Sequence, residues 1–246
     1  MKDIGADNAP SLRLDAGNDL CERPVLEQRR QLTVAKGIID IYVAMGYDAV
    51  AVGANDLAVG VDLLKKNRKL TWLSANLRDQ EGQVLFPASV VLSRGALRIG
   101  VIGLTGAVPA NETSLRLADW RPRLTEAVNA LRRDCHLLVV LSNLSATDEA
   151  EMMNNYPDID LIITADSIIR GNITPRSGSE GKPWQVQTIS EGKALGVLTL
   201  SGKEPPPSIP MNWENKTATV PLVMTLPEDP AIADMVRRIE QASAAQ

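Results

Sequence analysis

Tyr47-Asp-Ala-Val-Ala-Val-Gly-Ala-Asn-Asp-Leu-Ala-Val-Gly60 is the stretch that decides the fold. Its small apolar residues, Ala49 to Val52, predict a buried β-strand, and Gly53 predicts a turn at the end of that strand. Asn55 and Asp56 follow at the carboxyl end of the strand. Because ligands of open α/β sheets bind at the carboxyl ends of strands, Asn55 and Asp56 are candidate functional residues.

Outward from this stretch, predicted strands and helices alternate along the chain. Apolar residues at helical spacing predict a helix from about residue 26 to residue 45, with Gly46 at its end. Further strands are expected at residues 12–17, 70–77, 84–92, 97–104, 137–141, 159–163, 184–189 and 195–200. Helices are expected around residues 117–131, 148–155 and 230–239. This alternation indicates the α/β class.

Composition limits the kinds of partner. A net charge of −4 and only 3% aromatic residues argue against a nucleic-acid partner. No apolar run reaches the roughly 20 residues of a membrane span, and residues 1–7 show no signal-peptide pattern. The two cysteines, Cys21 and Cys135, give neither a disulfide framework nor a zinc site. The single histidine, His136, excludes a multi-histidine metal centre.

Residues 53–60 resemble a motif of the calcineurin-like metallophosphoesterases, in their 5'-nucleotidase-like branch, where the strand usually ends Gly-Asn-His-Glu-Phe-Asp-x-Gly. Other segments resemble that family in the same order: Leu14-Asp15-Ala16-Gly17, Ser74-Ala75-Asn76, residues 100–105, 142–145 and 164–168. The resemblance runs from Leu12 to about Glu240. It implies an α/β fold in which a sandwich of two β-sheets is flanked by helices.

The resemblance also implies a division of the chain. Residues 1–203 would form a metallophosphoesterase-like domain that is N-terminally incomplete, because the family's first strand, with its Asp-x-His pair, has no counterpart. Residues 204–246 would supply a proline-rich spacer, a final strand and a C-terminal helix that packs on the domain. Asp229 is the expected cap of that helix, with Pro230 at its first position. The residues expected to form its buried stripe are Ile232, Met235, Val236 and Ile239.

Most metal-ligand positions of the family have changed. A two-metal phosphoesterase holds two divalent ions roughly 3.5–4 Å apart with histidines, carboxylates and a bridging Asp. In this chain the bridging Asp falls on Asn18, the Asn ligand on Ala54, the three histidines on Asn143, Asp166 and Ile168, and the catalytic histidine on Asn55. These degenerate motifs predict that no metal is bound. If one is, the candidate ligands are Asp15, Asn18, Asn143 and Asp166, an oxygen set that favours calcium or magnesium.

These side chains also have a structural interpretation. Asn and Asp at strand ends commonly cap turns and helix starts, and capping is the commoner role for any one of them. The ordered match nevertheless predicts that the strands ending near Asn18, Asn55, Asn143 and Asp166 converge on one edge.

The sequence leaves the function, and whether the chain is an enzyme, open. The favoured hypothesis is a non-catalytic 5'-nucleotidase-like relative that acts as a binding or assembly module, without a cofactor, for another protein or a small ligand in the strand-end pocket. The alternative is an active metal-dependent phosphoester (nucleotide) hydrolase with an oxygen-rich metal site, in which Asn55 and Asp56 are the catalytic candidates. A third is a fragment with no role of its own. The resemblance further implies an extracytoplasmic (periplasmic) bacterial setting.

Overall fold

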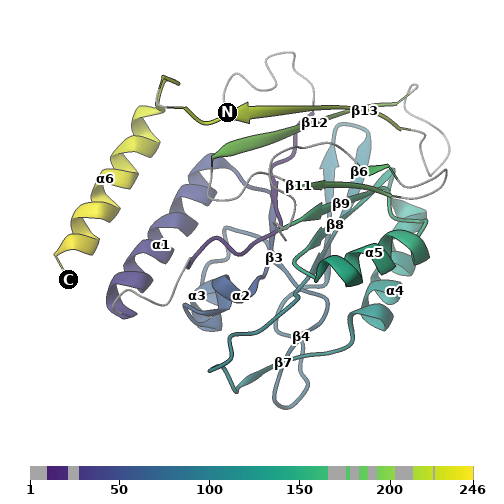
Figure 1. The fold of residues 1–246 in the computed structure, drawn as a ribbon, viewed down its shortest axis with the longest axis horizontal. Coiled ribbons are helices and arrows are strands. Elements are labelled where there is room, and N and C mark those ends of the chain that lie inside the picture. Colours follow the sequence, from purple (N-terminus) through teal and green to yellow (C-terminus); the bar gives the residue numbers. More distant parts are fainter. Residues whose placement is uncertain are drawn as a thin grey trace.

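The fold is built on two β-sheets that face each other (Figure 1). The computed structural model describes residues 10–21, 28–165, 176–177, 183–187, 193–202, 213–223 and 225–245. The smaller sheet is parallel and contains β1 (Leu14–Asp15), β2 (Ala49–Ala51) and β3 (Trp72–Leu73), in that order. The larger sheet has the order β10 (Arg176–Ser177), β11 (Trp184–Gln187), β9 (Leu161–Thr164), β8 (Leu137–Ser142), β6 (Leu97–Leu104) and β5 (Ser89–Arg94).

Small residues let the two sheets approach closely. Ala49 and Ala51 of β2 are fully buried against Val139 and Leu141 of β8 in one apolar cluster. A Cβ on Gly103 of β6 would lie 2.5 Å from the carbonyl oxygen of Leu73 on β3. Only glycine fits there, so the Gly-rich pattern of β6 reflects sheet packing.

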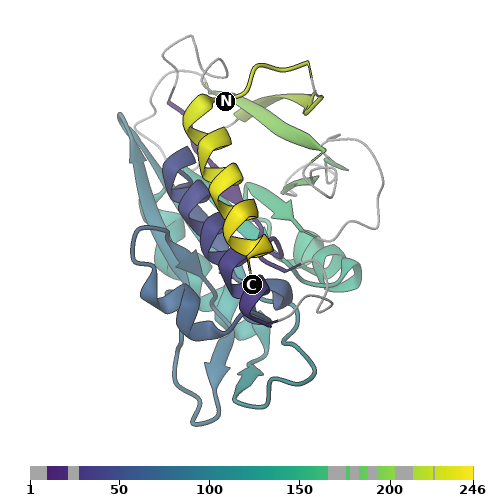
Figure 2. The same cartoon turned by 90° about the vertical axis from the view of Figure 1, so that its left-hand side faces the viewer.

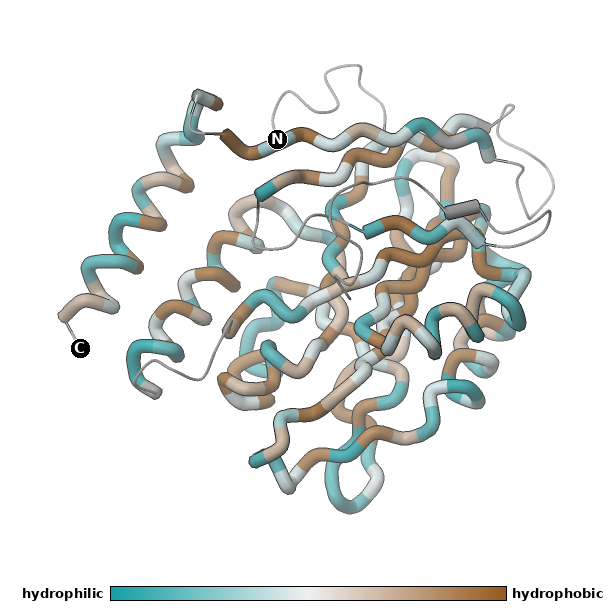
Figure 3. The backbone as a smooth tube through the Cα atoms, in the orientation of Figure 1, coloured by the Kyte–Doolittle hydropathy of each residue, from teal (hydrophilic) through white to brown (hydrophobic). Residues whose placement is uncertain are grey.

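Helices cover the two outer faces (Figure 2). On the smaller sheet lie α1 (Gln28–Met45), α2 (Ala54–Leu57) and α3 (Val61–Lys66), which bury Ile39, Leu57 and Leu64 in a cluster with strand residues. On the larger sheet lie α4 (Trp120–Leu131), the short 3₁₀ turn η1 (Arg132–Asp134) and α5 (Ala146–Asn155). Figure 3 shows the hydrophobic colouring concentrated on the inner strands and on the inward sides of these helices.

Two β-ribbons and a helix lie at the periphery. β4 (Leu77–Asp79) and β7 (Leu115–Leu117) form one antiparallel ribbon, and β12 (Ala194–Gly202) and β13 (Trp213–Pro221) form another. The last helix, α6 (Pro230–Ala244), is capped by Asp229 and lies beside α1, as both ribbon views show. A Cβ on Gly37 of α1 would lie 2.3 Å from Ile239, so the two helices touch.

The predicted α/β sandwich of two sheets flanked by helices is confirmed. The division at residue 203 stays a prediction; β12 and β13, on either side of it, pair along nine residues. In the part of the chain that the structure describes, no helix combines the length and apolar character needed to cross a membrane.

Three element predictions were wrong in detail. The single strand expected at residues 70–77 is instead two short strands, β3 and β4. Between them the Asn76 side chain donates to Thr105 O and the Ser74 hydroxyl accepts the N–H of Leu77, and the chain turns there. Leu117, expected on a helix, lies in β7, since Asp119 caps a helix that begins at Trp120. Val236, expected in a buried stripe of α6, is 39% exposed.

Candidate functional site

The ends of β1, β2 and β8 meet at one edge of the sandwich, as predicted. The backbone N–H of Asn55 donates to the side-chain oxygen of Asn18 at 3.1 Å. The side-chain amide of Asn143 donates to the carbonyl oxygen of Ala16. Asp166 lies outside the described residues, although Ala165 before it bonds to Ser142 at this edge. Asn18, Asn55 and Asn143 therefore converge as expected.

Asp56 lies beneath this edge and is 1% exposed. One of its carboxylate oxygens accepts the backbone N–H groups of Gly53 (2.8 Å) and Asn18 (2.9 Å), and the other accepts those of Asp19 (3.0 Å) and Leu20 (3.2 Å). We call these five residues the Asp56 clasp. The clasp ties the loop after β1 to the loop after β2.

Two opposite effects determine the pKa of Asp56 in the clasp. Burial raises the pKa of Asp56 to about 6, and the hydrogen bonds from the backbone of Asn18, Gly53 and Leu20 limit the rise. Both carboxylate oxygens have backbone donors, so Asp56 is a structural anchor of the loop rather than a side chain open to a ligand.

The loop after β1 adopts a conformation that suits its sequence. Gly17 has φ 85° and Asn18 has φ 79°, and glycine and asparagine are the residues that most readily adopt this left-handed region. A Cβ on Gly17 would lie 2.2 Å from the carbonyl oxygen of Ala51. Because the loop crosses β2 this closely, its N–H groups reach Asp56.

Asn18 and Asn143 present their side-chain oxygens to one point. A Cβ on Gly53 would lie 2.2 Å from the Asn18 Oδ1 atom and 2.4 Å from the Asn143 Oδ1 atom. The Asn143 Oδ1 atom is buried and has no hydrogen-bond partner among the described residues. The strand-end edge thus offers two neutral acceptors beside Gly53, one of them unpaired.

A second polar group joins the two sheets at the same edge. Asn76 and Thr105 exchange two hydrogen bonds, from Asn76 Nδ2 to Thr105 O (2.8 Å) and from Thr105 N to Asn76 Oδ1 (2.9 Å). The Thr105 hydroxyl donates to Val52 O at 2.8 Å and lies 2.7 Å from the Ser74 hydroxyl. We call Ser74, Asn76, Thr105 and Val52 the Asn76–Thr105 bridge. It holds Val52, and therefore Gly53, against the larger sheet.

Several solved structures have the same fold as this chain. The chain superposes on sulfate thiohydrolase SoxB of Thermus thermophilus with a TM-score of 0.78 and 23% identity, covering 97% of this chain and 44% of that one. It matches a 5'-nucleotidase precursor of Thermus thermophilus at 0.76 and 21%, with coverages of 99% and 52%. Calcineurin-like phosphoesterase YfkN of Bacillus subtilis gives 0.72 and 16%, with coverages of 94% and 83%. The chain has the calcineurin-like phosphoesterase fold.

The fold match leaves the activity open. The chain spans about half the length of the first two matched structures. No protein-family model matches the sequence, and no curated protein matches it. A functional conclusion therefore depends on the side chains that this chain places at the strand ends of the phosphoesterase fold.

The residues present do not fit a two-metal phosphoesterase centre. Ala54 has no donor atom, both oxygens of Asp56 accept backbone N–H groups, and Asn18 and Asn143 offer neutral oxygens. Within the described ranges no three His, Cys, Asp or Glu side chains are grouped to hold a metal ion. His136 precedes β8, so it lies at the amino end of that strand, and Cys21 and Cys135 are buried and are not joined in a disulfide. The side chains at the strand ends therefore offer oxygen atoms as hydrogen-bond acceptors.

One cluster near the phosphoesterase strand ends was not predicted. The Tyr42 hydroxyl of α1 donates to Asp15 Oδ2 at 3.0 Å, and Asp15 Oδ1 accepts the N–H of Gly17 at 2.7 Å. Asp19 keeps an exposed surface, yet its carboxyl group bonds to Asp15 and Tyr42 inside the cluster. Burial of that group, followed by the charges of Asp15 and Asp56, raises the pKa of Asp19 to about 9. The apolar helix pattern around Tyr42 gave no sign of this contact.

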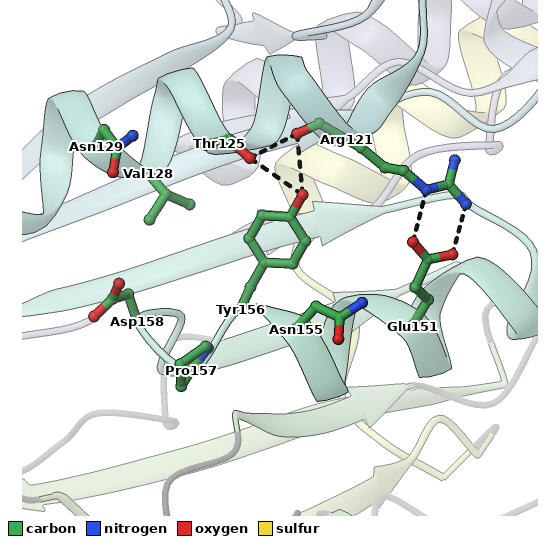
Figure 4. Close-up of a pocket in the computed structure, with 9 residues that line it drawn as sticks. All are labelled: Arg121, Thr125, Val128, Asn129, Glu151, Asn155, Tyr156, Pro157 and Asp158. Carbon is green, nitrogen blue, oxygen red and sulfur yellow. Dashed lines mark hydrogen bonds and ion pairs between the residues drawn. The ribbon is translucent and has the colours of Figure 1, made fainter.

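Two hollows mark the surface. One of about 300 Å³ lies at the strand-end edge and is lined by Asn76, Thr105, Gly106, Trp120 and Asp148 among others. The other, of about 420 Å³, lies between α4 and α5, where Arg121 forms a two-point ion pair with Glu151 (2.5 and 2.6 Å) and Tyr156 bonds to Thr125 (Figure 4). None of the site residues predicted from the sequence lines either hollow, but the smaller one is lined by Asn76 and Thr105 of the bridge beside the strand ends, so we place the candidate site there.

Proposed function

We propose that this chain is a non-catalytic member of the phosphoesterase fold that acts as a binding or assembly module. The observation that carries the proposal is the Asp56 clasp. Asp56, a buried carboxylate at the ends of β1 and β2, accepts four backbone N–H groups and fixes a loop. Metal-assisted hydrolysis needs ligands that can bind the ions and activate a water molecule, and Asp56 has no free oxygen for that role.

Charge also opposes a phosphoester substrate. Asp15, Asp19 and Asp56 cluster at the end of β1 and β2, and no cationic side chain hydrogen-bonds to them among the described residues. Asp56, with a pKa of about 6, is ionised near neutral pH and repels a phosphate dianion when no metal ion lies between them, whereas Asp19, with a pKa of about 9, is protonated and adds no charge. Asn55, at the position of the family's catalytic histidine, donates its amide to Asn18 O at 3.3 Å and cannot act as a general acid near neutral pH.

The test is a steady-state assay of the pure chain with nucleotide monophosphates and an aryl phosphate, with added magnesium or manganese. The matched variants are Asn55→Ala with Asn143→Ala, and, as a control away from the edge, Arg98→Gln. We expect no turnover that distinguishes the three proteins. Metal-dependent turnover that is lost only in the double variant would reject the non-catalytic proposal.

A second function is favoured by one observation. The unpaired Asn143 Oδ1 atom lies beside Asn18 Oδ1, and Asp15 is near in sequence. An active phosphoester hydrolase would use such oxygens for a hard divalent ion, since calcium and magnesium prefer oxygen ligands. Calorimetric titration with calcium or magnesium, comparing the natural chain with Asn143→Leu, tests it. Binding in the micromolar range that Asn143→Leu removes would support this function.

The proposal includes an extracytoplasmic, periplasmic setting, which the family resemblance implies. Fractionation of the source cells, followed by detection with a specific antibody, tests it. Recovery in the cytoplasmic fraction alone would reject this part of the proposal.

A further inference from the structure

Two arginines face each other on the β4–β7 ribbon. Arg78 of β4 lies directly opposite Arg116 of β7 in antiparallel register, so both side chains leave the same face. Opposed residues of such a pair have Cβ atoms about 5 Å apart, and like charges there are destabilising. The ribbon is held together by Leu77 and Leu115, which are buried, and not by this pair. The arginines therefore need another explanation.

The guanidinium groups are anchored without neutralising their charge. Arg78 Nη1 donates to Leu77 O at 2.9 Å, and Arg116 Nε donates to Asp79 O at 3.0 Å. Both acceptors are main-chain carbonyl oxygens, and in the described part of the chain neither arginine forms an ion pair. Asp79 alternates to the other face of the ribbon and accepts the N–H of Gln83 at 2.7 Å.

A third arginine, from α4, adds to this surface. Arg123 forms an exposed ion pair with Glu126 at 2.8 Å. Burial lowers the pKa of Arg78, and the charge of Arg123 lowers it further, while Glu126 acts in the opposite direction. Arg123 and Glu126 are thus both close enough to Arg78 for their charges to act on it. The surface adjoins the strand-end hollow, because Leu117 and Asn76, next to the ribbon arginines, line that hollow.

We propose that Arg78, Arg116 and Arg123 form a docking surface for an acidic segment of another protein. A guanidinium group binds a carboxylate through two parallel N–H donors, and each arginine keeps donors free for this. Carboxylates on alternate residues of an extended segment are about 7 Å apart, a spacing that two neighbouring long side chains can match. The inference is independent of whether the strand-end site hydrolyses phosphoesters.

The experiment measures binding of a fluorescently labelled octaglutamate peptide to the natural chain by anisotropy at low salt. The test variant is Arg78→Gln with Arg116→Gln. The control is Arg98→Gln with Arg133→Gln, which removes the same charge from exposed residues outside the ribbon. We expect the test variant to weaken binding about tenfold, and the control to change it less than about twofold. Raising the salt to about 0.3 M should weaken binding to the natural chain toward the value of the test variant.

Two results would overturn the proposal. One is equal weakening by test and control variants, which would show that only net charge matters. The other is displacement of the peptide by inorganic phosphate at about 1 mM, which would make the surface a phosphate site. Thermal unfolding keeps the result interpretable, because removing opposed like charges should leave the folding of the test variant intact or improve it.

Discussion

The Asp56 clasp and the Asn76–Thr105 bridge both hold the chain together at the strand-end edge, but they do so with different chemical groups. Each joins segments that are far apart in sequence, and each bonds main-chain atoms with buried side chains. The clasp uses a charged group with four donors, whereas the bridge uses neutral groups. The comparison shows that a carboxylate at a candidate catalytic position can have a structural role. Its contribution to the stability of the fold then depends on its charge and therefore on pH.

The largest effect should come from Asp56→Ala. This change leaves four N–H groups, two of them in buried hydrogen bonds, without their acceptor, so we expect a loss of about 3–5 kcal/mol in the free energy of unfolding. Urea denaturation measures it. Asp56→Asn, which keeps the shape and one acceptor oxygen, should lose less. A loss below about 1 kcal/mol for Asp56→Ala would mean that the clasp does not hold the loop.

Gly53→Ala should disturb the clasp by volume alone. The new Cβ would lie 2.2 Å from Asn18 Oδ1 and 2.4 Å from Asn143 Oδ1, so we expect a loss of about 2–3 kcal/mol. Gly95→Ala is the control, because its Cβ would meet nothing within 4 Å and only the positive φ of 59° opposes it. Equal losses in thermal or urea unfolding would show that close packing at Gly53 is unimportant.

Asn76→Ala should weaken the bridge by about 2 kcal/mol. It removes both partners of the Thr105 main chain, whose N–H and carbonyl groups are buried. Because the bridge carries no charge, the loss should be the same at acid and neutral pH. A loss that changes with pH between about 5.5 and 7.5, relative to the natural chain, would contradict the neutral character of the bridge.

The smallest effect is the pH dependence of the clasp. The pKa of Asp56 is raised from 3.8 to about 6 on folding, so the folded state binds this proton more tightly than the unfolded state. The contribution of Asp56 to stability therefore falls as pH rises through 6, by about 1 kcal/mol between pH of about 5.5 and 7.5.

Comparison with Asp56→Asn removes this titration. The raised pKa of Asp19 adds a change of the same sign in both proteins, and this change is smaller in Asp56→Asn because the charge of Asp56 contributes to the rise. Urea unfolding at the two pH values should therefore show a shallower pH dependence for Asp56→Asn than for the natural chain. Identical pH dependence would indicate that Asp56 is not the titrating group.

The sequence predicted the arrangement of the strand ends better than their chemistry. The order of the strands sufficed to bring Asn18, Asn55 and Asn143 together. The role of Asp56 was not predictable, because three of its four partners are backbone N–H groups of residues 36 to 38 positions earlier, and backbone donors leave no pattern in sequence. Tyr42 was missed for a related reason: its ring fits an apolar helix face while its hydroxyl reaches Asp15.

The contact between α1 and α6 has a consequence for synthesis on the ribosome. Arg30 Nε donates to Ser243 Oγ across 213 residues of sequence. At about 5–20 residues per second, α1 is made roughly 10–40 s before the helix that covers it. During that interval its groove at Gly37, which later receives Ile239, is open to water and to other apolar surfaces. Translation speed should therefore affect the yield of folded chain.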